Sequence, residues 1–127
     1  MDTPLRSVVK AAKKDDYVIA VGLFGSTARR EKTARDVDIC VFLKQGTYSK
    51  KDLSDYLLKY TSLDEKYDVH IFQLLPFYVQ EEIIKDVVFM FIKDSNLLYD
   101  LLRFAHTEFE EYNPYYESYL EEIYNAT

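Results

Sequence analysis

Two apolar runs near the N-terminus constrain the fold of this chain most strongly. Residues 17–24 read YVIAVGLF, and residues 36–43 read DVDICVFL. Continuous β-branched runs of this length are typical of strands that are buried on both faces of a sheet. The first run ends in Gly25-Ser26, and the second begins with two aspartates, Asp36 and Asp38. The sequence therefore predicts a layered fold with these runs as central strands.

The rest of the chain alternates between helical and strand patterns. Helix patterns cover residues 3–16, 50–63, 77–86, 95–112 and 114–124. A strand with an acidic start is expected over residues 66–75, whereas residues 87–92 fit either a short strand or the end of a helix. Asn113-Pro114 is expected to interrupt the C-terminal helix. These elements predict a small mixed sheet flanked by helices, an α/β or α+β arrangement, and they leave the strand order open.

Composition narrows the class of protein. The chain has 127 residues, of which 48% are hydrophobic and 30% are charged, which suits one soluble domain. A net charge of -6 argues against extended nucleic-acid binding, which needs a basic face, although a nucleotide needs only a few local cations. One cysteine, no signal peptide and no apolar run of about 20 residues lead us to expect a cytoplasmic protein without a membrane partner.

Three aspartates point to a divalent cation. Asp36 and Asp38 are two residues apart, so they face the same side of a strand. Asp68 begins another apolar run in the same manner. If the two strands are neighbours, three carboxylates converge, and such a cluster does not stay fully ionised alone. Mg²⁺ takes oxygen ligands from carboxylates and substrate phosphates, so the sequence predicts a site for Mg²⁺, with two ions able to serve a phosphoryl reaction.

A phosphate-binding turn is expected just before these aspartates. Gly25 lets the backbone approach a phosphate, and the helix expected to start at Ser26 offers unpaired N–H groups and a hydroxyl. Arg29 and Arg30 can neutralise a phosphate tail, although either can equally be a solvated helix residue. Nine residues separate this turn from Asp36. The pattern thus predicts a binding site for the phosphates of a nucleoside triphosphate next to a metal site.

This combined pattern resembles the nucleotidyltransferase superfamily that includes DNA polymerase β. The short chain is similar to its minimal nucleotidyltransferase (MNT) branch, which in many bacteria and archaea is encoded beside a HEPN-domain protein as a toxin–antitoxin pair. The resemblance covers residues 18–94 and includes the stretch LLPFYVQEEIIKDVVFMFIKD. It implies the polymerase β-like fold and one nucleotidyltransferase domain over residues 1–127, with residues 95–127 as a C-terminal helical extension.

The resemblance assigns the nucleotide to the Gly-Ser turn. Gly25 and Ser26 would hold the β- and γ-phosphates, and Arg29 would assist them. Many minimal members have glycine where Arg30 stands, so this side chain narrows the expected phosphate loop.

The same resemblance assigns the metal ions and the chemistry to the aspartates. Asp36 and Asp38 would bind both Mg²⁺ ions. Asp68 would bind the catalytic ion and help to deprotonate the acceptor hydroxyl. Arg35 stands where many minimal members have serine, which puts a cation beside the metal site. Because all three carboxylates are present, an active enzyme is expected.

The resemblance implies transfer of AMP from ATP to a tyrosine of a HEPN toxin, with this chain as the antitoxin. Two other functions stay open. One is a catalytically inactive module of the same fold that neutralises a partner by binding it. The other is a nucleotidyltransferase that acts on a small molecule, although no second substrate domain is visible in 127 residues. A polymerase is disfavoured because the chain lacks a basic duplex-binding domain.

Other polar and aromatic residues have structural interpretations. Cys40 is expected in the core and His106 on the surface of a helix. His70 is expected to be a hydrogen-bonded structural histidine, and a position near the site is the alternative, because it follows Asp68 on the same strand face. The C-terminus is rich in tyrosine and glutamate. About half of its tyrosines are expected to pack on the sheet, and the rest could form a partner surface: Tyr112, Tyr115, Tyr116, Tyr119 and Tyr124.

Overall fold

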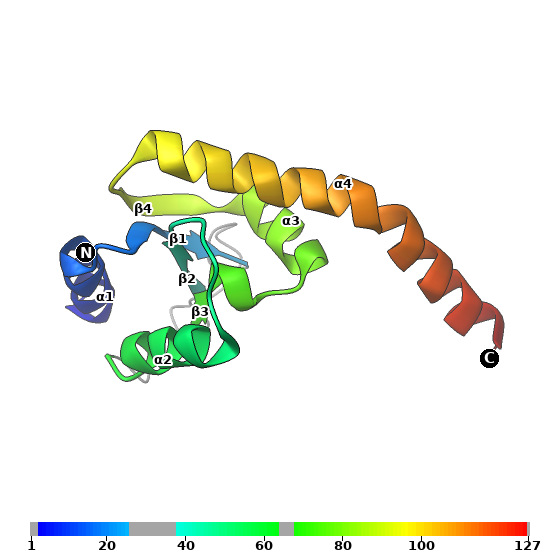
Figure 1. The fold of residues 1–127 in the computed structure, drawn as a ribbon. Helices are drawn as coiled ribbons and strands as arrows, with labels where there is room; N and C mark the ends of the chain where they lie inside the picture. The colour runs from blue at the N-terminus through cyan, green and yellow to red at the C-terminus, as the bar shows by residue number, and fades with distance from the viewer. Residues whose placement is uncertain (1–2, 26–37, 64–67, 127) are drawn as a thin grey trace.

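The computed structural model describes residues 3–25, 38–63 and 68–126, in which helices and strands alternate (Figure 1). The helices are α1 (Thr3–Lys14), α2 (Lys50–Thr61), α3 (Phe77–Asp86) and α4 (Ser95–Ala126). The strands are β1 (Val18–Phe24), β2 (Asp38–Leu43), β3 (Asp68–Ile71) and β4 (Val88–Ile92), and a 3₁₀ turn, η2 (Phe72–Leu74), follows β3. The ambiguous segment before α4 is therefore a strand.

Within the described ranges, the strands form one mixed sheet in the order β3-β2-β1-β4. The central strand β1 pairs antiparallel with both β2 and β4, and β2 pairs parallel with β3. In this register Asp38 lies opposite Phe24 on one side and opposite Asp68 on the other. The expected mixed sheet flanked by helices is confirmed, and the neighbouring strands place two of the aspartates side by side.

Helices cover both faces of the sheet, which explains the continuous apolar runs. Side chains of β2 alternate between two cores: Ile39 and Val41 pack towards α1 and α2, whereas Cys40 and Phe42 pack towards α3 and α4. Figure 1 shows α4 on one side of the strands and α2 on the other. Because Asp38 shares its strand face with Cys40, its side chain lies on the α3–α4 side of the sheet.

The strand expected over residues 66–75 is shorter in the structure. β3 ends at Ile71, and the chain turns through η2 before Pro76 caps α3. The side chain of Gln73 takes over the pairing with β2, because its amide accepts from Leu43 N at 3.2 Å and donates to Leu43 O at 2.7 Å. A side-chain amide thus satisfies the backbone groups at the end of β2, so the backbone of β3 can turn away.

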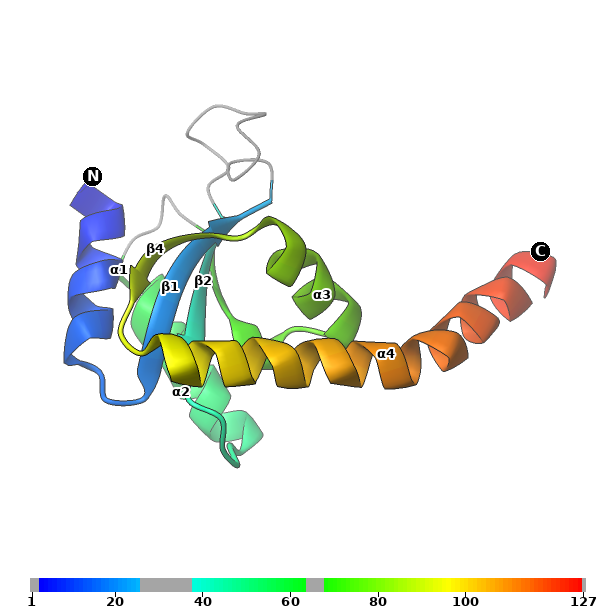
Figure 2. The same cartoon turned by 90° about the horizontal axis from the view of Figure 1, so that it is seen from above.

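The interruption expected at Asn113-Pro114 is wrong. α4 runs from Ser95 to Ala126 with Pro114 inside it. Proline removes one backbone hydrogen bond and bends a helix, but it does not end one whose flanking turns are intact. The C-terminal half of α4 bends and extends away from the sheet and its other helices (Figures 1 and 2).

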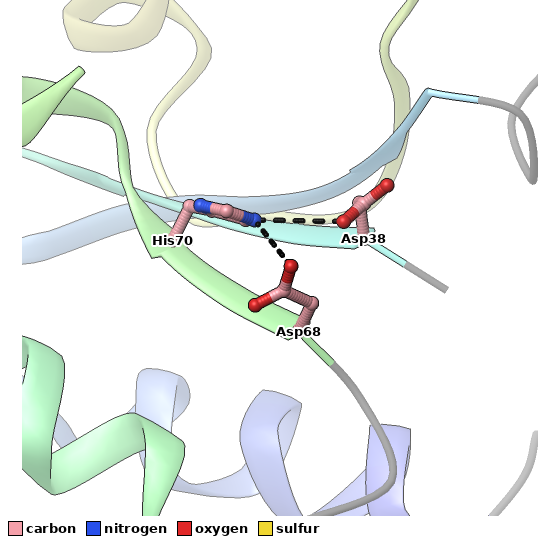
Figure 3. Close-up of side chains that lie close together, drawn as sticks. All are labelled: Asp38, Asp68 and His70. Carbon is pink, nitrogen blue, oxygen red and sulfur yellow. Dashed lines mark ion pairs between the residues drawn. The ribbon is translucent and has the colours of Figure 1, made fainter. Parts of the chain in front are cut away.

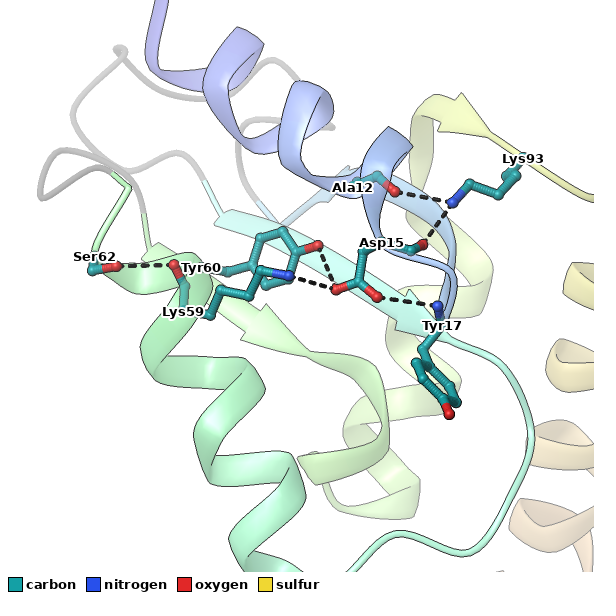
Figure 4. A network of polar contacts seen from close by, with 7 residues as sticks. All are labelled: Ala12, Asp15, Tyr17, Lys59, Tyr60, Ser62 and Lys93. Atoms are coloured by element: carbon teal, nitrogen blue, oxygen red, sulfur yellow. Dashed lines mark hydrogen bonds and ion pairs between the residues drawn. The ribbon is translucent and has the colours of Figure 1, made fainter.

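A polar network centred on the buried carboxylate of Asp15 holds α1, α2 and β4 together at the end of β1 that is remote from Gly25 (Figure 4). Asp15 accepts from Lys59 Nζ at 2.8 Å, from the Tyr60 hydroxyl at 3.2 Å and from Tyr17 N at 3.0 Å. Lys93 Nζ donates to the carbonyl oxygens of Ala12 and Asp15, at the C-terminus of α1. These contacts satisfy the backbone groups that a helix end leaves unpaired. In the part of the chain that the structure describes, no helix is both long and apolar enough to span a bilayer.

Candidate functional site

The candidate site lies where β2 and β3 begin, at one edge of the sheet. Parallel pairing places Asp38 directly opposite Asp68, and His70 follows Asp68 on the same strand face. The imidazole Nε2 of His70 lies 3.5 Å from Asp38 Oδ1 and 3.3 Å from Asp68 Oδ2 (Figure 3). The ring of Phe24, at the end of β1, packs edge-on against His70 with 5.3 Å between ring centroids. Three neighbouring strands therefore supply this site.

Gly25 lies beside the carboxylate of Asp38 and needs to be a glycine for two reasons. Its φ angle is +74°, in the left-handed region that side chains disfavour. In addition, a Cβ atom at this position would come within 2.8 Å of Asp38 Oδ2. Gly25, the described residue of the predicted phosphate turn, therefore lies directly beside the predicted metal ligand Asp38.

Asp38 is held in a partly dry environment. Its side chain is 28% exposed, compared with 70% for Asp68. Burial raises the pKa of Asp38, the charge of Asp68 raises it further, and His70 opposes both effects. A raised carboxyl pKa means that ionised Asp38 lacks enough positive charge around it. A bound cation would supply that charge.

The donor set fits a hard divalent cation. Among the described residues, Asp38, Asp68 and His70 each offer one ligand atom, and these atoms all lie within 4.8 Å of one another. Two carboxylates with an open side match the way in which Mg²⁺ binds, through one or two carboxylates together with water and substrate phosphate oxygens. A histidine nitrogen is a poorer ligand for Mg²⁺ than a carboxylate oxygen. We therefore assign His70 a role in orienting the two carboxylates beside it and not in binding the metal ion.

The structure brings together part of the predicted site. Gly25, Asp38 and Asp68 lie at one sheet edge, as the sequence pattern predicts. The other predicted site residues lie outside the described residues, as do the two arginines that depart from the minimal pattern: Ser26, Arg29, Arg30, Arg35 and Asp36.

His70 is the site residue that sequence reasoning undervalued. We expected a hydrogen-bonded structural histidine, with a position near the site as the alternative, and its Nε2 atom lies between the two carboxylates. The available signal was its spacing, since a residue two positions after Asp68 shares the same strand face. Phe24, which packs against His70, carried no signal because it reads as the end of a buried strand.

A hollow of about 550 Å³ lies at the opposite end of the sheet, between the start of β1 and α2. Its walls include Tyr17, Tyr48, Tyr56 and the buried Asp15. The carboxylate of Asp15 is already occupied by Lys59 and Tyr60, so it is not available as a catalytic base or a metal ligand. The Asp38–Asp68 edge therefore remains the candidate site among the described residues.

Comparison with known proteins finds relatives of this chain. A protein of Methanocaldococcus jannaschii, described as a "putative protein adenylyltransferase", is 41% identical over 70 residues. That match covers 54% of this chain and 52% of the relative, so it spans about half the length of the curated relative.

Solved structures share the fold of this chain. A chain from a crystal structure of a toxin–antitoxin with AMP-PNP superposes with a TM-score of 0.68 at 13% identity, covering 93% of this chain and 96% of that one. A structure of a tri-AMPylated Shewanella oneidensis HEPN toxin in complex with its MNT antitoxin gives a TM-score of 0.62 at 13% identity, with 95% and 98% covered. At these identities the likeness shows the fold alone.

The family is shown by the sequence itself. The sequence profile described as "Polymerase beta, Nucleotidyltransferase" matches residues 6–96, which include Gly25 and all three aspartates of the predicted site. This region also contains the whole sheet and the edge at which Asp38 and Asp68 meet. The chain belongs to the polymerase β-type nucleotidyltransferase family.

Proposed function

We propose that this protein transfers AMP from ATP to a tyrosine of a HEPN-type toxin and thereby acts as its antitoxin. The observation that carries the proposal is the convergence of Gly25, Asp38 and Asp68 at one edge of the sheet. A glycine turn for phosphates and paired carboxylates for a metal ion are the parts that nucleotidyl transfer needs. Other acceptors with a hydroxyl group would use the same site.

The relatives support the choice of nucleotide and acceptor. The archaeal relative is described as a "putative protein adenylyltransferase". One structural neighbour was solved with AMP-PNP, and another contains an AMPylated HEPN toxin together with its MNT antitoxin. These descriptions apply to those proteins, and we extend them to this chain as the proposal.

The nucleotide-binding residues would be Gly25, Ser26 and Arg29. Gly25 leaves room for the backbone to face the β- and γ-phosphates, because no side chain stands between it and Asp38. Ser26 would donate its hydroxyl, and Arg29 would neutralise the phosphate charge. In this arrangement the triphosphate lies against the carboxylate edge.

The reaction would take place at the carboxylates. The acceptor oxygen forms a bond with the α-phosphorus of ATP, the bond from that phosphorus to the bridging oxygen breaks, and pyrophosphate leaves. Asp68 is 70% exposed and can accept the proton of the acceptor hydroxyl. Asp36, Asp38 and Asp68 would hold two Mg²⁺ ions, which supply positive charge for the phosphates when bound. His70 would orient both described carboxylates through its Nε2 atom.

Labelled ATP tests the proposal. The protein is incubated with Mg²⁺, the HEPN-type protein and ATP labelled at either the α- or the γ-phosphate. We expect label on the acceptor from the α-position and none from the γ-position. Asp38→Asn should abolish transfer, whereas Asp55→Asn, an exposed aspartate of α2, should not.

Three results would contradict the proposal. Label from the γ-position would indicate a kinase reaction. A stable complex with no label under any condition would instead support the inactive binding module. Transfer at the wild-type rate by Asp38→Asn would show that the reaction occurs elsewhere.

A further inference from the structure

The N-terminal half of α4 is a packing helix. Leu98, Leu101 and Ala105 recur every three to four residues and are buried in the core between α4 and the sheet. The next members of the same stripe are Phe109 and Tyr112, whose rings contact Phe77 of α3 with centroid distances of 6.0 and 6.2 Å. One face of α4 is therefore committed to α3 and the sheet.

The same stripe continues beyond the body of the protein. Tyr115, Tyr119 and Ile123 follow Tyr112 at helical spacing, and their side chains are 76%, 58% and 46% exposed. Leu120, adjacent to this line on the helix surface, is 44% exposed. Both views show this part of α4 extending away from the sheet (Figures 1 and 2). We call residues 115–123 the arm.

Most of the C-terminal tyrosines do not pack on the sheet as expected, although Tyr112 contacts Phe77 of α3. Packing on the sheet was expected for about half of the five C-terminal tyrosines, but four of them are at least half exposed: Tyr112, Tyr115, Tyr119 and Tyr124. An exposed stripe of large aromatic and aliphatic side chains is costly in water and is typical of a surface that binds a partner.

Charge identifies the kind of partner. Residues 107–127 contain six glutamates and no lysine or arginine, and the remaining chain has 16 acidic and 16 basic residues, so the whole net charge of -6 resides in this segment. Glu111 precedes Tyr115 by four residues and Glu122 follows Tyr119 by three, so both border the apolar stripe. The arm is therefore an apolar ridge with glutamates along one border.

We propose that the arm docks into an apolar groove bordered by lysine or arginine side chains on the acceptor protein. This inference rests on the proposed function for the identity of the partner. A second copy of the chain is a poor occupant, because two arms in contact would place like charges together. An amphipathic helix that lies in a hydrophobic groove is a common recognition mode, and complementary rim charges select the partner.

The position of the arm would also bring the acceptor to the reacting side of the sheet. α4 covers the sheet face to which Asp38, Asp68 and His70 belong. A protein held by the arm is therefore on the same side of the sheet as the reacting edge. Arm contacts would contribute affinity for the acceptor without touching the reacting atoms, so their loss should raise KM and leave kcat unchanged.

The test uses the full chain and the HEPN-type protein. One double variant, Tyr119→Ala with Ile123→Ala, removes two large apolar side chains from the ridge. Another, Glu111→Lys with Glu122→Lys, reverses the charge along its border. The matched controls are Tyr99→Ala and Asp100→Lys, two exposed positions in the packing half of the same helix. Affinity is measured by calorimetry at low and high salt, together with label transfer, Mg²⁺–ATP binding, melting temperature and sedimentation.

We expect both arm variants to lose affinity for the HEPN-type protein by about 30-fold or more. Wild-type affinity should fall with salt, and the border variant should have lost most of that salt dependence. The controls should stay within about twofold of wild type. Mg²⁺–ATP binding and melting temperature should be unchanged in the arm variants, because the altered side chains are exposed.

Any one of four outcomes would overturn the inference. They are wild-type affinity in both arm variants, equal losses in the controls, no complex with the HEPN-type protein, and a wild-type dimer that the arm variants convert to a monomer. The proposed reaction fails separately. If the arm variants weaken a complex that shows no label transfer, docking stands and AMP transfer is rejected; if Asp38→Asn loses transfer but keeps affinity, both stand.

Discussion

Replacing Gly25 with alanine tests whether the glycine turn and the metal carboxylates form one site. The added Cβ would lie 2.8 Å from Asp38 Oδ2, closer than ordinary contacts allow, so the carboxylate has to move. The backbone also keeps a φ angle of +74°, at which a residue other than glycine costs about 1–2 kcal/mol. One substitution therefore perturbs both stability and the catalytic geometry.

The two effects have different sizes. The stability loss of about 1 kcal/mol, after allowing for the less flexible unfolded chain, should lower the melting temperature by about 4 °C. A shift of the Asp38 carboxylate by up to about 1 Å should lower the rate of AMP transfer by about 100-fold. The rate effect therefore exceeds what partial unfolding could produce at assay temperature.

The assay compares the transfer rate at saturating Mg²⁺–ATP with urea unfolding of the same samples. Gly46→Ala is the matched control: the nearest atom to its new Cβ would be Tyr48 Cε2 at 3.8 Å, and its φ angle is not in the positive region. We expect this control to transfer at the wild-type rate. The reasoning is refuted if Gly25→Ala keeps the wild-type rate, or if the control loses as much activity.

Three further predictions follow from buried or paired charges. Asp15→Ala should destabilise the protein by about 1–3 kcal/mol in urea unfolding, because the buried hydroxyl of Tyr60 loses its acceptor; a smaller loss would mean that water replaces the carboxylate. The pKa of His106 is raised, chiefly by its hydrogen bond to Glu81, so its contribution to stability is complete below about pH 6.5 and is lost as pH rises through the raised value. The melting temperature of wild type should therefore fall towards that of His106→Gln on going from about pH 6 to pH 9, and a constant difference would contradict the pairing. Asp38→Asn should not lower the melting temperature without Mg²⁺, since burial already disfavours the ionised side chain, and it should remove the stabilisation that Mg²⁺–ATP gives to wild type.

The sheet could be predicted because its pattern is local. The runs that became β1 and β2 are apolar on both faces, and only a strand covered by two helix layers accommodates them. The site also had a local signal, since acidic residues at the head of a buried strand need a partner. Asp68 joined Asp38 because β2 and β3 pair in parallel, a register that the sequence alone left open.

The differences arise where tertiary contacts override local signals. β3 stops at Ile71 because the side chain of Gln73 completes the pairing with β2, which no periodicity reveals. Pro114 lies inside α4, although proline usually marks a helix end. His70 became a site residue through strand pairing, whereas its sequence context indicated only a strand face.

The exposed tyrosines of the arm show a different limit of prediction from sequence. An aromatic residue at helical spacing has the same pattern whether it packs on its own sheet or on another protein. Ala105 and Tyr119 belong to one continuous stripe, yet the first is buried and the second is exposed. Only the length of α4 relative to the body separates them, and that length is a property of the whole fold.

The most direct test of the central claim is the intact mass of the HEPN-type protein after incubation with this protein, Mg²⁺ and ATP. The account predicts a gain of one or more AMP groups, located on tyrosine by peptide fragmentation, and no gain with Asp38→Asn or Asp68→Asn. An unmodified acceptor in a stable complex with wild-type protein would contradict it, as would the same mass gain with either variant.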